Sequence, residues 1–455
     1  MSRHLEDGLF ELATERIRMD KGFQKIAINK NFDRMDYNLF QEYRLYQLKK
    51  TLERAFQISR FYRKLYKEHG VSADDIQSIS DISKLPFTFP SDLGGKNFEF
   101  LCISQAGVEK PVSFYSSGTT GLKKQIYFSE MDTLKILKFL SRGMNTVIEK
   151  EKGRIQIFLQ NTSGRGAANI LKNSVESYGM KAWVSDIEID TSEEMLKLCK
   201  ENKTNVWFGD VFSILRFTKE MEHKVDLSDL GVKVLFLTMS NISDSMIAYL
   251  EKVWGCYIST HYGLTEMGWG LAVDCDTCNG YHYNELDVIA EVVNPKTGEV
   301  LPDGEVGELT FTSIGREAMP LIRYRSGDIS SLSNPICGHH LKVMQRILRR
   351  IEGAYQLNEE EFIYPALIEE ELYKVDEVVD YRVKADKSQL YFDVEVTDIG
   401  NNGKTKEIVI QEIISYLKNV PAINNCNKIP IISLLELGTL RKYCFEKKRI
   451  QTIEK

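Results

Sequence analysis

Short apolar runs alternate with amphipathic stretches through the middle of the chain. The apolar runs cover residues 154–160, 205–212 and 232–239. Stretches such as 192–202 and 243–254 carry apolar residues at helical spacing. Strands and helices in alternation predict an α/β domain with mainly parallel strands.

The pattern differs on either side of this region. Residues 38–70 combine apolar and aromatic residues at helical spacing with many charges, which predicts an amphipathic helix ending near Gly70. Two prolines within 84–93 then break any helix. Residues 287–313 contain strands joined by Pro, Gly and Asp turns, which predicts antiparallel hairpins.

A third region begins near Gly353 and has its own elements. They are a helix at about 365–374, strands near 379–384 and 390–396, and a helix at about 405–418. We therefore predict a large domain at 1–350 and a smaller α+β domain at 351–455.

The bulk properties exclude several classes of protein. The chain has 455 residues, enough for two or three domains. A net charge of −6 argues against nucleic acid as the main partner. No apolar run approaches the roughly 20 residues that span a bilayer, and the N-terminus lacks the apolar stretch of a signal peptide. We expect a cytoplasmic protein without a membrane partner and, given eight cysteines in so long a chain, no disulfide scaffold.

Residues 115–124, "YSSGTTGLKK", combine four Ser and Thr hydroxyls with two glycines and two lysines. Glycines let backbone N–H groups point into one concavity, which attracts anions, and the lysines add charge. Such a loop suits phosphate, although its spacing is not that of the P-loop. A solvated linker is the alternative on this stretch alone.

Two further motifs follow the loop in order, "HYGLTEMG" at 261–268 and "PLIRYRSGDIS" at 320–330. The three together resemble the adenylate-forming superfamily, enzymes that activate carboxylic acids with ATP. Residues 58–93 and 291–330 also resemble its phenylacetate–coenzyme A ligase branch. The resemblance implies a large N-terminal domain with mixed sheets and an antiparallel subregion, followed by a small, mobile α+β domain.

The resemblance implies roles for the loop and for the second motif. The loop would grip the β- and γ-phosphates of ATP through Ser116, Ser117, Gly118, Thr119, Thr120, Gly121 and Lys124. Tyr262 and Gly263 would stack on adenine, since an aromatic face suits a purine ring. Thr265 would touch the α-phosphate, and Glu266 would hold Mg²⁺, which takes carboxylate oxygen.

Other residues of the nucleotide and acyl sites follow from the same resemblance. Asp328 would accept hydrogen bonds from both ribose hydroxyls, and Arg325 or Arg323 would approach the nucleotide. Arg350 fits the hinge between the two domains. Tyr115 and Trp269 would wall the acyl pocket, and the bulky indole suggests an aryl or short acid.

The implied reaction has two steps. A carboxylate attacks the α-phosphorus of ATP to give an acyl-adenylate and pyrophosphate, and a thiol, that of coenzyme A, then takes the acyl group as the C-terminal domain rotates. The chain departs from the family at Ala354, where a second hinge arginine is usual. The adenylation lysine is predicted as Lys447 or Lys448. These departures leave open transfer to an amine or to a carrier-protein thiol, and a nucleotide-binding protein without turnover.

A group of thiols and imidazoles stands apart from these motifs. Cys275, Cys278, His282 and Cys337 have spacing that suits a tetrahedral structural Zn²⁺. Relatives in the branch carry Cys and His at similar places, with a cysteine where this chain has Pro335. A loop with unpaired thiols is the alternative. Relatives commonly form homodimers, which the resemblance implies here as well.

Overall fold

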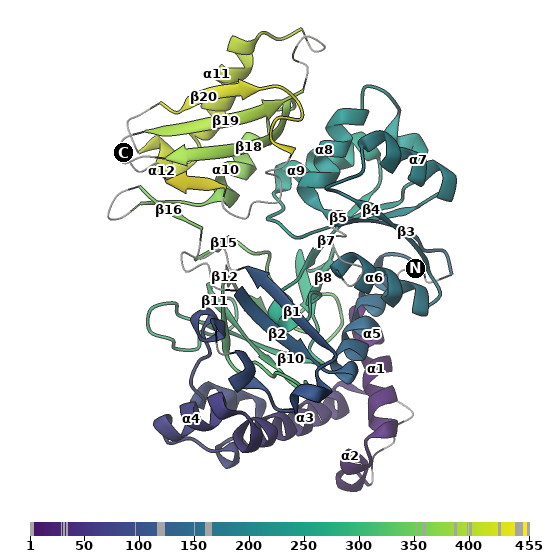
Figure 1. The fold of residues 1–455 in the computed structure, drawn as a ribbon, viewed down its shortest axis with the longest axis vertical. Coiled ribbons are helices and arrows are strands. Elements are labelled where there is room, and N and C mark those ends of the chain that lie inside the picture. Colours follow the sequence, from purple (N-terminus) through teal and green to yellow (C-terminus); the bar gives the residue numbers. More distant parts are fainter. Residues whose placement is uncertain are drawn as a thin grey trace. The chain divides into compact units, whose positions relative to one another are not determined.

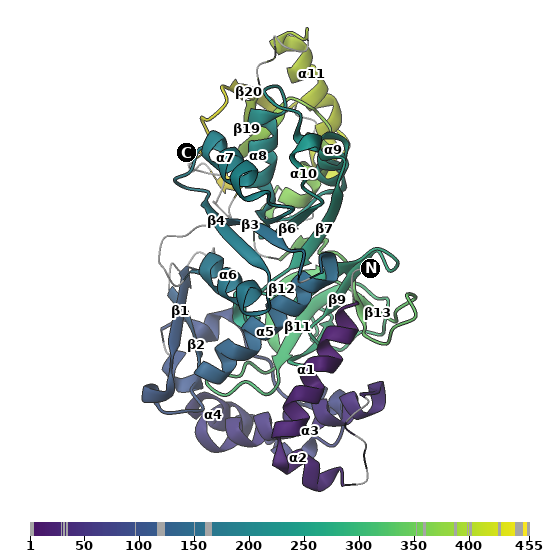
Figure 2. The ribbon, with the colours of Figure 1, turned by 90° about the vertical axis from the view of Figure 1, so that its right-hand side faces the viewer.

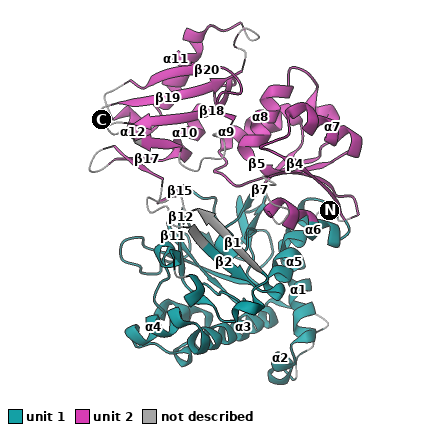
Figure 3. Cartoon of the chain, in the orientation of Figure 1, with its two compact units in different colours: residues 1–150, 173–179, 261–347 teal, residues 151–172, 180–260, 348–455 magenta. Residues whose placement is uncertain are grey.

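A computed structural model gives the fold of most of the chain. It describes residues 4–28, 30, 32, 35–95, 97–115, 123–149, 151–159, 166–351, 353–357, 361–385, 389–397, 399, 403–425, 429–441 and 449–452. The chain forms two compact units, drawn in different colours in Figure 3. Unit 1 comprises residues 1–150, 173–179 and 261–347, and unit 2 comprises 151–172, 180–260 and 348–455.

Helices open unit 1. They are α1 (Leu5–Met19), α2 (Lys21–Ile26), α3 (Tyr37–Ile58) and α4 (Arg60–His69). The single helix predicted over 38–70 is wrong, because the backbone is extended at Ser59. The Ser59 hydroxyl accepts the Tyr62 N–H and so begins α4. As expected, the helical stretch ends at Gly70, which has φ +64°.

Five short 3₁₀ helices lead from α4 to the first hairpin of unit 1. They are Ala73–Asp75, Ile79–Lys84, Pro90–Leu93, Asn97–Phe100 and Gln105–Gly107. The hairpin pairs β1 (Lys110–Tyr115) with β2 (Lys123–Phe128), and α5 (Glu130–Val147) follows it. Figure 2 shows α1 lying along α5.

The rest of unit 1 is antiparallel sheet. One sheet contains β10 (Val288–Val293), β11 (Gly307–Ser313) and β12 (Tyr324–Ser330), which confirms the hairpin predicted over 287–313. The strands β8 (Ala272–Cys275), β9 (Gly280–Tyr283), β13 (Leu332–Ser333) and β14 (Val343–Met344) also pair antiparallel and form one end of a larger sheet, whose other strands are parallel.

Unit 2 contains the predicted parallel sheet (Figure 1). Its strands are β3 (Arg154–Leu159), β4 (Lys181–Asp186), β5 (Val206–Asp210), β6 (Val234–Thr238) and β7 (Tyr257–Tyr262), in the order β4–β3–β5–β6–β7. The helices α6 (Ala167–Ser177), α7 (Ser192–Asn202), α8 (Val211–Met221) and α9 (Asp244–Trp254) alternate with them along the chain, as does a 3₁₀ turn at Leu227–Leu230. The second part of α6, from residue 173, belongs to unit 1. Strand β7 runs on into unit 1, whose part of the chain resumes at His261.

The C-terminal part of unit 2 contains the two helices and two strands predicted for it, together with short elements that were not predicted. They are β15 (Arg349–Arg350), β16 (Tyr355–Gln356), β17 (Phe362–Ile363), α10 (Pro365–Leu372), β18 (Val378–Ala385), β19 (Leu390–Val396), α11 (Lys406–Leu417), α12 (Pro421–Asn424), β20 (Ile431–Leu435) and β21 (Ile450–Thr452). They share one hydrophobic core with α8 and α9. The division into domains at 1–350 and 351–455 stays a prediction, since the two compact units divide the chain differently.

Within the described residues, no helix is both long and apolar enough to cross a bilayer. The cytoplasmic location stays a prediction.

Candidate active site

The second and third motifs meet through one hydrogen bond in unit 1. Tyr262 stands at the end of β7, and its hydroxyl donates to Asp328 Oδ2 at 2.6 Å. Asp328 lies in β12 and is 3% exposed. The residue expected on adenine therefore contacts the residue expected on ribose, although they are 66 positions apart in the chain.

We expect Tyr262→Phe to lower the free energy of unfolding by about 1–3 kcal/mol. The phenyl ring keeps the packing but leaves the buried Asp328 carboxylate without this donor. Urea denaturation of wild type and variant measures the difference. A change below about 0.3 kcal/mol would show that solvent replaces the phenol at no cost.

Glu266 is held from two directions. It lies in a 3₁₀ turn, Thr265–Met267, and is 6% exposed. The Tyr324 hydroxyl donates to Glu266 Oε1 at 2.7 Å, and Arg316 Nη1 donates to the Glu266 carbonyl at 2.6 Å. These bonds fix both the side chain and the backbone, which preorganises the carboxylate.

The backbone around Glu266 folds back on itself. A Cβ on Gly263 would lie 1.9 Å from the Trp269 carbonyl oxygen, so only glycine fits there. Trp269 has φ +66°, a value that non-glycine residues rarely adopt and that occurs mainly where structure around the residue enforces it. Its ring stacks on Phe128, with centroids 5.2 Å apart.

A small cavity lies between α5 and this turn. Its volume is about 30 Å³, and Ile136 and Phe139 of α5 face Gly268 and Gly270 across it. Arg316 lines the same cavity and lies 5.1 Å from the centroid of the Phe128 ring. Trp269 therefore supports the cavity through Phe128, while its acyl-wall role stays a prediction.

The predicted arginines are engaged with other groups. Arg323 donates from Nε to Glu291 at 3.0 Å and also binds the Ser83 and Leu85 carbonyls. Arg325 forms an ion pair with Glu308 on the neighbouring strand. Their approach to a nucleotide stays a prediction. Arg350 lies in unit 2 and is exposed.

Several predicted residues cannot be compared with the structure. Ser116, Ser117, Gly118, Thr119, Thr120, Gly121, Lys447 and Lys448 lie outside the described residues. The strands that flank the loop do pair, with Tyr115 opposite Lys123 and Phe114 opposite Lys124.

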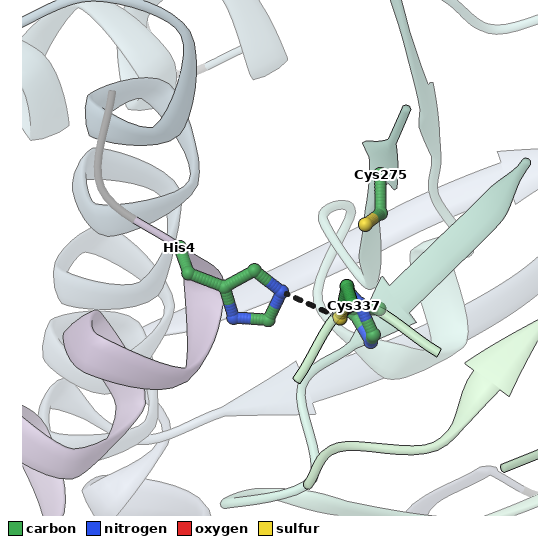
Figure 4. Close-up of side chains that lie close together, drawn as sticks. His4, Cys275 and Cys337 are labelled. Carbon is green, nitrogen blue, oxygen red and sulfur yellow. Dashed lines mark hydrogen bonds between the residues drawn. The ribbon is translucent and has the colours of Figure 1, made fainter. Parts of the chain in front are cut away.

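The predicted thiol and imidazole group forms with one change of member. His4, Cys275, His282 and Cys337 offer ligand atoms that all lie within 4.8 Å of one another. Figure 4 shows His4 and Cys337 facing each other, with His4 Nε2 and Cys337 Sγ 3.7 Å apart. Burial raises the pKa of the Cys275 thiol to about 12, and the nearby Cys278 thiol adds to the shift. Sequence reasoning missed His4, and no local pattern marks it.

The comparisons with known proteins agree with these motifs. Residues 112–316 match the family model described as AMP-binding enzyme. The phenylacetate-coenzyme A ligase of Aromatoleum evansii is 28% identical over 381 residues, covering 81% of this chain and 85% of that protein. The enzyme of the same name from Pseudomonas putida is 26% identical over 344 residues, covering 74% of this chain and 76% of that protein.

The solved structures support the fold. A 2-hydroxyisobutyryl-CoA ligase in the postadenylation state, in complex with 2-HIB-AMP, has a TM-score of 0.79 at 17% identity and covers 92% of this chain and 91% of that chain. This likeness confirms the predicted α/β fold class with a large N-terminal and a smaller C-terminal domain. Together the matches confirm that the chain resembles the adenylate-forming superfamily and, within it, the phenylacetate–coenzyme A ligase-like branch.

Proposed function

We propose that the protein is an AMP-forming acid–thiol ligase. It activates a carboxylic acid with ATP to an acyl-adenylate, releases pyrophosphate, and transfers the acyl group to coenzyme A as a thioester. The observation that carries this proposal is the hydrogen bond between Tyr262 and Asp328. It is joined by the buried Glu266, whose carboxylate and carbonyl each accept a hydrogen bond from a neighbouring side chain. The match of residues 112–316 to an AMP-binding family supports it.

The described residues divide the work of the first step. Tyr262 and Asp328 bind adenosine, Thr265 contacts the α-phosphate, and Glu266 supplies a carboxylate oxygen of the kind that Mg²⁺ takes. The enzyme needs no covalent intermediate of its own. It aligns the acid with the phosphorus and stabilises the charge that develops on the phosphate oxygens, and a bound Mg²⁺ neutralises part of that charge.

The cavity beside Glu266 supports a compact acid. About 30 Å³ holds a group of roughly two water molecules. Ile136 and Phe139 offer an apolar wall, and Arg316 and Lys135 offer hydrogen-bond donors. Two carboxylates, those of Asp132 and Asp287, also line the cavity. We propose an aryl or short acyl carboxylate as the substrate, of which only a small group enters this cavity.

We further propose a structural Zn²⁺ held by Cys275, His282 and Cys337. The His282 Nε2 and Cys337 Sγ atoms are 3.4 Å apart. Zn–S and Zn–N bonds of about 2.3 and 2.0 Å at a tetrahedral angle place such atoms about 3.5 Å apart, so the spacing fits. A homodimer and a cytoplasmic location complete the proposal.

The acyl acceptor has an alternative. Ala354 replaces the second arginine expected in the hinge, and this departure favours an enzyme that passes its acyl group to an amine or to a carrier-protein thiol. The third alternative is a nucleotide-binding protein without turnover. None of the site residues that the structure describes favours it.

Acid-dependent exchange of labelled pyrophosphate into ATP tests the function. A panel of aryl and short-chain carboxylates is assayed with wild type, with Glu266→Gln as the inactive control. Exchange with one class of acid, lost in the control, establishes adenylation. Coenzyme A is then added. Formation of a coenzyme A thioester shows that coenzyme A, and not an amine or a carrier protein, is the acyl acceptor. ATP binding without exchange on any acid contradicts the proposal and favours the third alternative.

A further inference from the structure

The predicted zinc site has a fourth ligand that the sequence did not indicate. A tetrahedral zinc site takes four ligands, so beside Cys275, His282 and Cys337 one position remains to be filled. The structure places His4 at this position: its ligand atom lies within 4.8 Å of those of Cys275, His282 and Cys337. Cys278, predicted as the substitute, is not in this group of four, although its thiol contacts those of Cys275 and Cys337.

The neighbouring histidine is already in the form that binds metal. His282 Nδ1 lies 3.3 Å from the Lys342 carbonyl oxygen, an acceptor, so Nδ1 carries the proton. In a neutral ring Nε2 then has its lone pair available, and it points to Cys337 Sγ at 3.4 Å. A second nitrogen that donates to a carbonyl is the usual arrangement of a zinc-bound histidine. His282 is 1% exposed, which excludes competing water.

His4 has to change one hydrogen bond to bind the metal. Its Nδ1 accepts the Glu6 N–H at 3.1 Å and caps helix α1. Coordination through Nε2 moves the ring proton to Nδ1, so this cap is lost. The free energy of binding a structural zinc far exceeds that of one capping hydrogen bond.

The start of α1 is anchored to the loop of Cys337 by a second, independent set of bonds. The Glu6 carboxylate accepts the backbone N–H groups of His340 at 2.6 Å and Leu341 at 3.1 Å. The His339 ring stacks on His4, with centroids 3.5 Å apart. These contacts hold the His4 side chain beside Cys337 before any ion arrives, which lowers the entropy lost on coordination.

We propose that His4 is the fourth ligand of the zinc, so that the metal clamps the first turn of α1 to the β8–β9 hairpin and to the loop at 334–341. The inference rests on the zinc site proposed above and not on the ligase activity. The ligand set is two thiolates and two imidazoles, which suits Zn²⁺.

Helix α5 connects α1 to the candidate active site through packing contacts on both. Gly8 packs so closely on α5 that a Cβ there would lie 3.0 Å from Arg142 Cβ. On its other side α5 contacts the turn that follows Glu266, since a Cβ on Gly270 would lie 2.5 Å from Leu140. Metal at His4 therefore supports the helix that forms one wall of the acyl cavity.

Metal analysis and cobalt substitution of the full chain test the ligand set. We expect about one zinc per chain in wild type and in Cys278→Ser, and zinc affinity at least about 100-fold lower in His4→Ala. His4→Cys keeps a ligand and restores binding, so it separates lost coordination from lost folding. The thiolate-to-cobalt absorption of the Co²⁺ form reports the number of sulfur ligands, and we expect equal intensity in wild type and Cys278→Ser.

Hydrogen exchange measures the clamp without reference to activity. We expect chelation of the metal to increase amide exchange across residues 5–19 of wild type by at least about tenfold. In zinc-free His4→Ala, the chelator should have little effect on exchange. Loss of zinc in Cys278→Ser with retention in His4→Ala would overturn the inference in favour of a three-cysteine site. Wild type that takes up no zinc would overturn it together with the zinc site, while leaving the ligase proposal untouched.

Discussion

Replacing Arg216 with alanine is expected to lower the free energy of unfolding by about 3–5 kcal/mol. Arg216 lies on α8 and is 5% exposed. Its guanidinium forms an ion pair with Glu395 and lies 3.3 Å from Asp380, both on the C-terminal sheet of unit 2. These two carboxylates are buried more completely than the arginine.

The size of the effect follows from what the substitution leaves behind. Asp380 keeps Arg449 as a partner, whereas Glu395 keeps the backbone N–H groups of Gly438 and Leu440 and loses its cation. A buried carboxylate without a counterion is costly because the interior solvates charge poorly. The network therefore stabilises the packing of residues 378–396 against α8.

Urea denaturation of a matched series measures this effect. Arg216→Met loses the cation but keeps most of the side-chain volume. It should therefore be less destabilised than Arg216→Ala only by the packing contacts that alanine loses. Adding Glu395→Gln to Arg216→Met removes the carboxylate that has lost its counterion. The free energy of unfolding should then rise by at least about 2 kcal/mol relative to Arg216→Met. Equal stability of the single and double variants would contradict the coupling, and a loss below about 1 kcal/mol for Arg216→Ala would show that solvent reaches the network.

This packing bears on the predicted motion of the C-terminal domain. The family rotates that domain between its two half-reactions, but here residues 348–455 share a core and a buried ion network with residues 180–260. Any such rotation relative to α8 has to break these bonds. The Arg216 series therefore also measures part of the free energy that the predicted motion would require.

Periodicity predicted the fold where elements are long and regular. The helix predicted at 192–202 has these very bounds as α7, and β3, β5 and β6 fall within the three predicted apolar runs, whereas β4 and β7 were not predicted. The break between α3 and α4 was missed because Ser59 starts α4 through a local hydrogen bond, without a proline or glycine to mark it.

Motifs predicted which residues matter but not all of their partners. Tyr262 and Asp328 each came from a motif, and the structure adds the bond between them. Arg325 looked available for nucleotide because its partner Glu308 lies on the neighbouring strand, and strand register cannot be read from one sequence. His4 lies 333 positions from Cys337, so only the folded chain brings the two together.

Replacing Glu266 with glutamine is expected to reduce the rate of acid-dependent pyrophosphate exchange by about 10²–10³-fold. Glutamine has nearly the same shape, and its carbonyl oxygen can still accept the Tyr324 hydroxyl that now bonds Glu266 Oε1. The substitution therefore removes a negative charge while it preserves the turn. The loss should appear mainly in kcat, because the charge acts on Mg²⁺ and phosphate in the transition state.

Tyr324→Phe is the matched control for this charge. It removes the hydroxyl that orients Glu266 but keeps the carboxylate, so we expect a loss of about tenfold and no change in the Mg²⁺ dependence of the rate. In Glu266→Gln, by contrast, half-saturation should shift to higher Mg²⁺, because the ion has lost an anionic ligand. Equal activity of Glu266→Gln and wild type at saturating Mg²⁺ would show that the carboxylate does not hold the ion, and the first step would then have to draw its electrostatic stabilisation from the lysines.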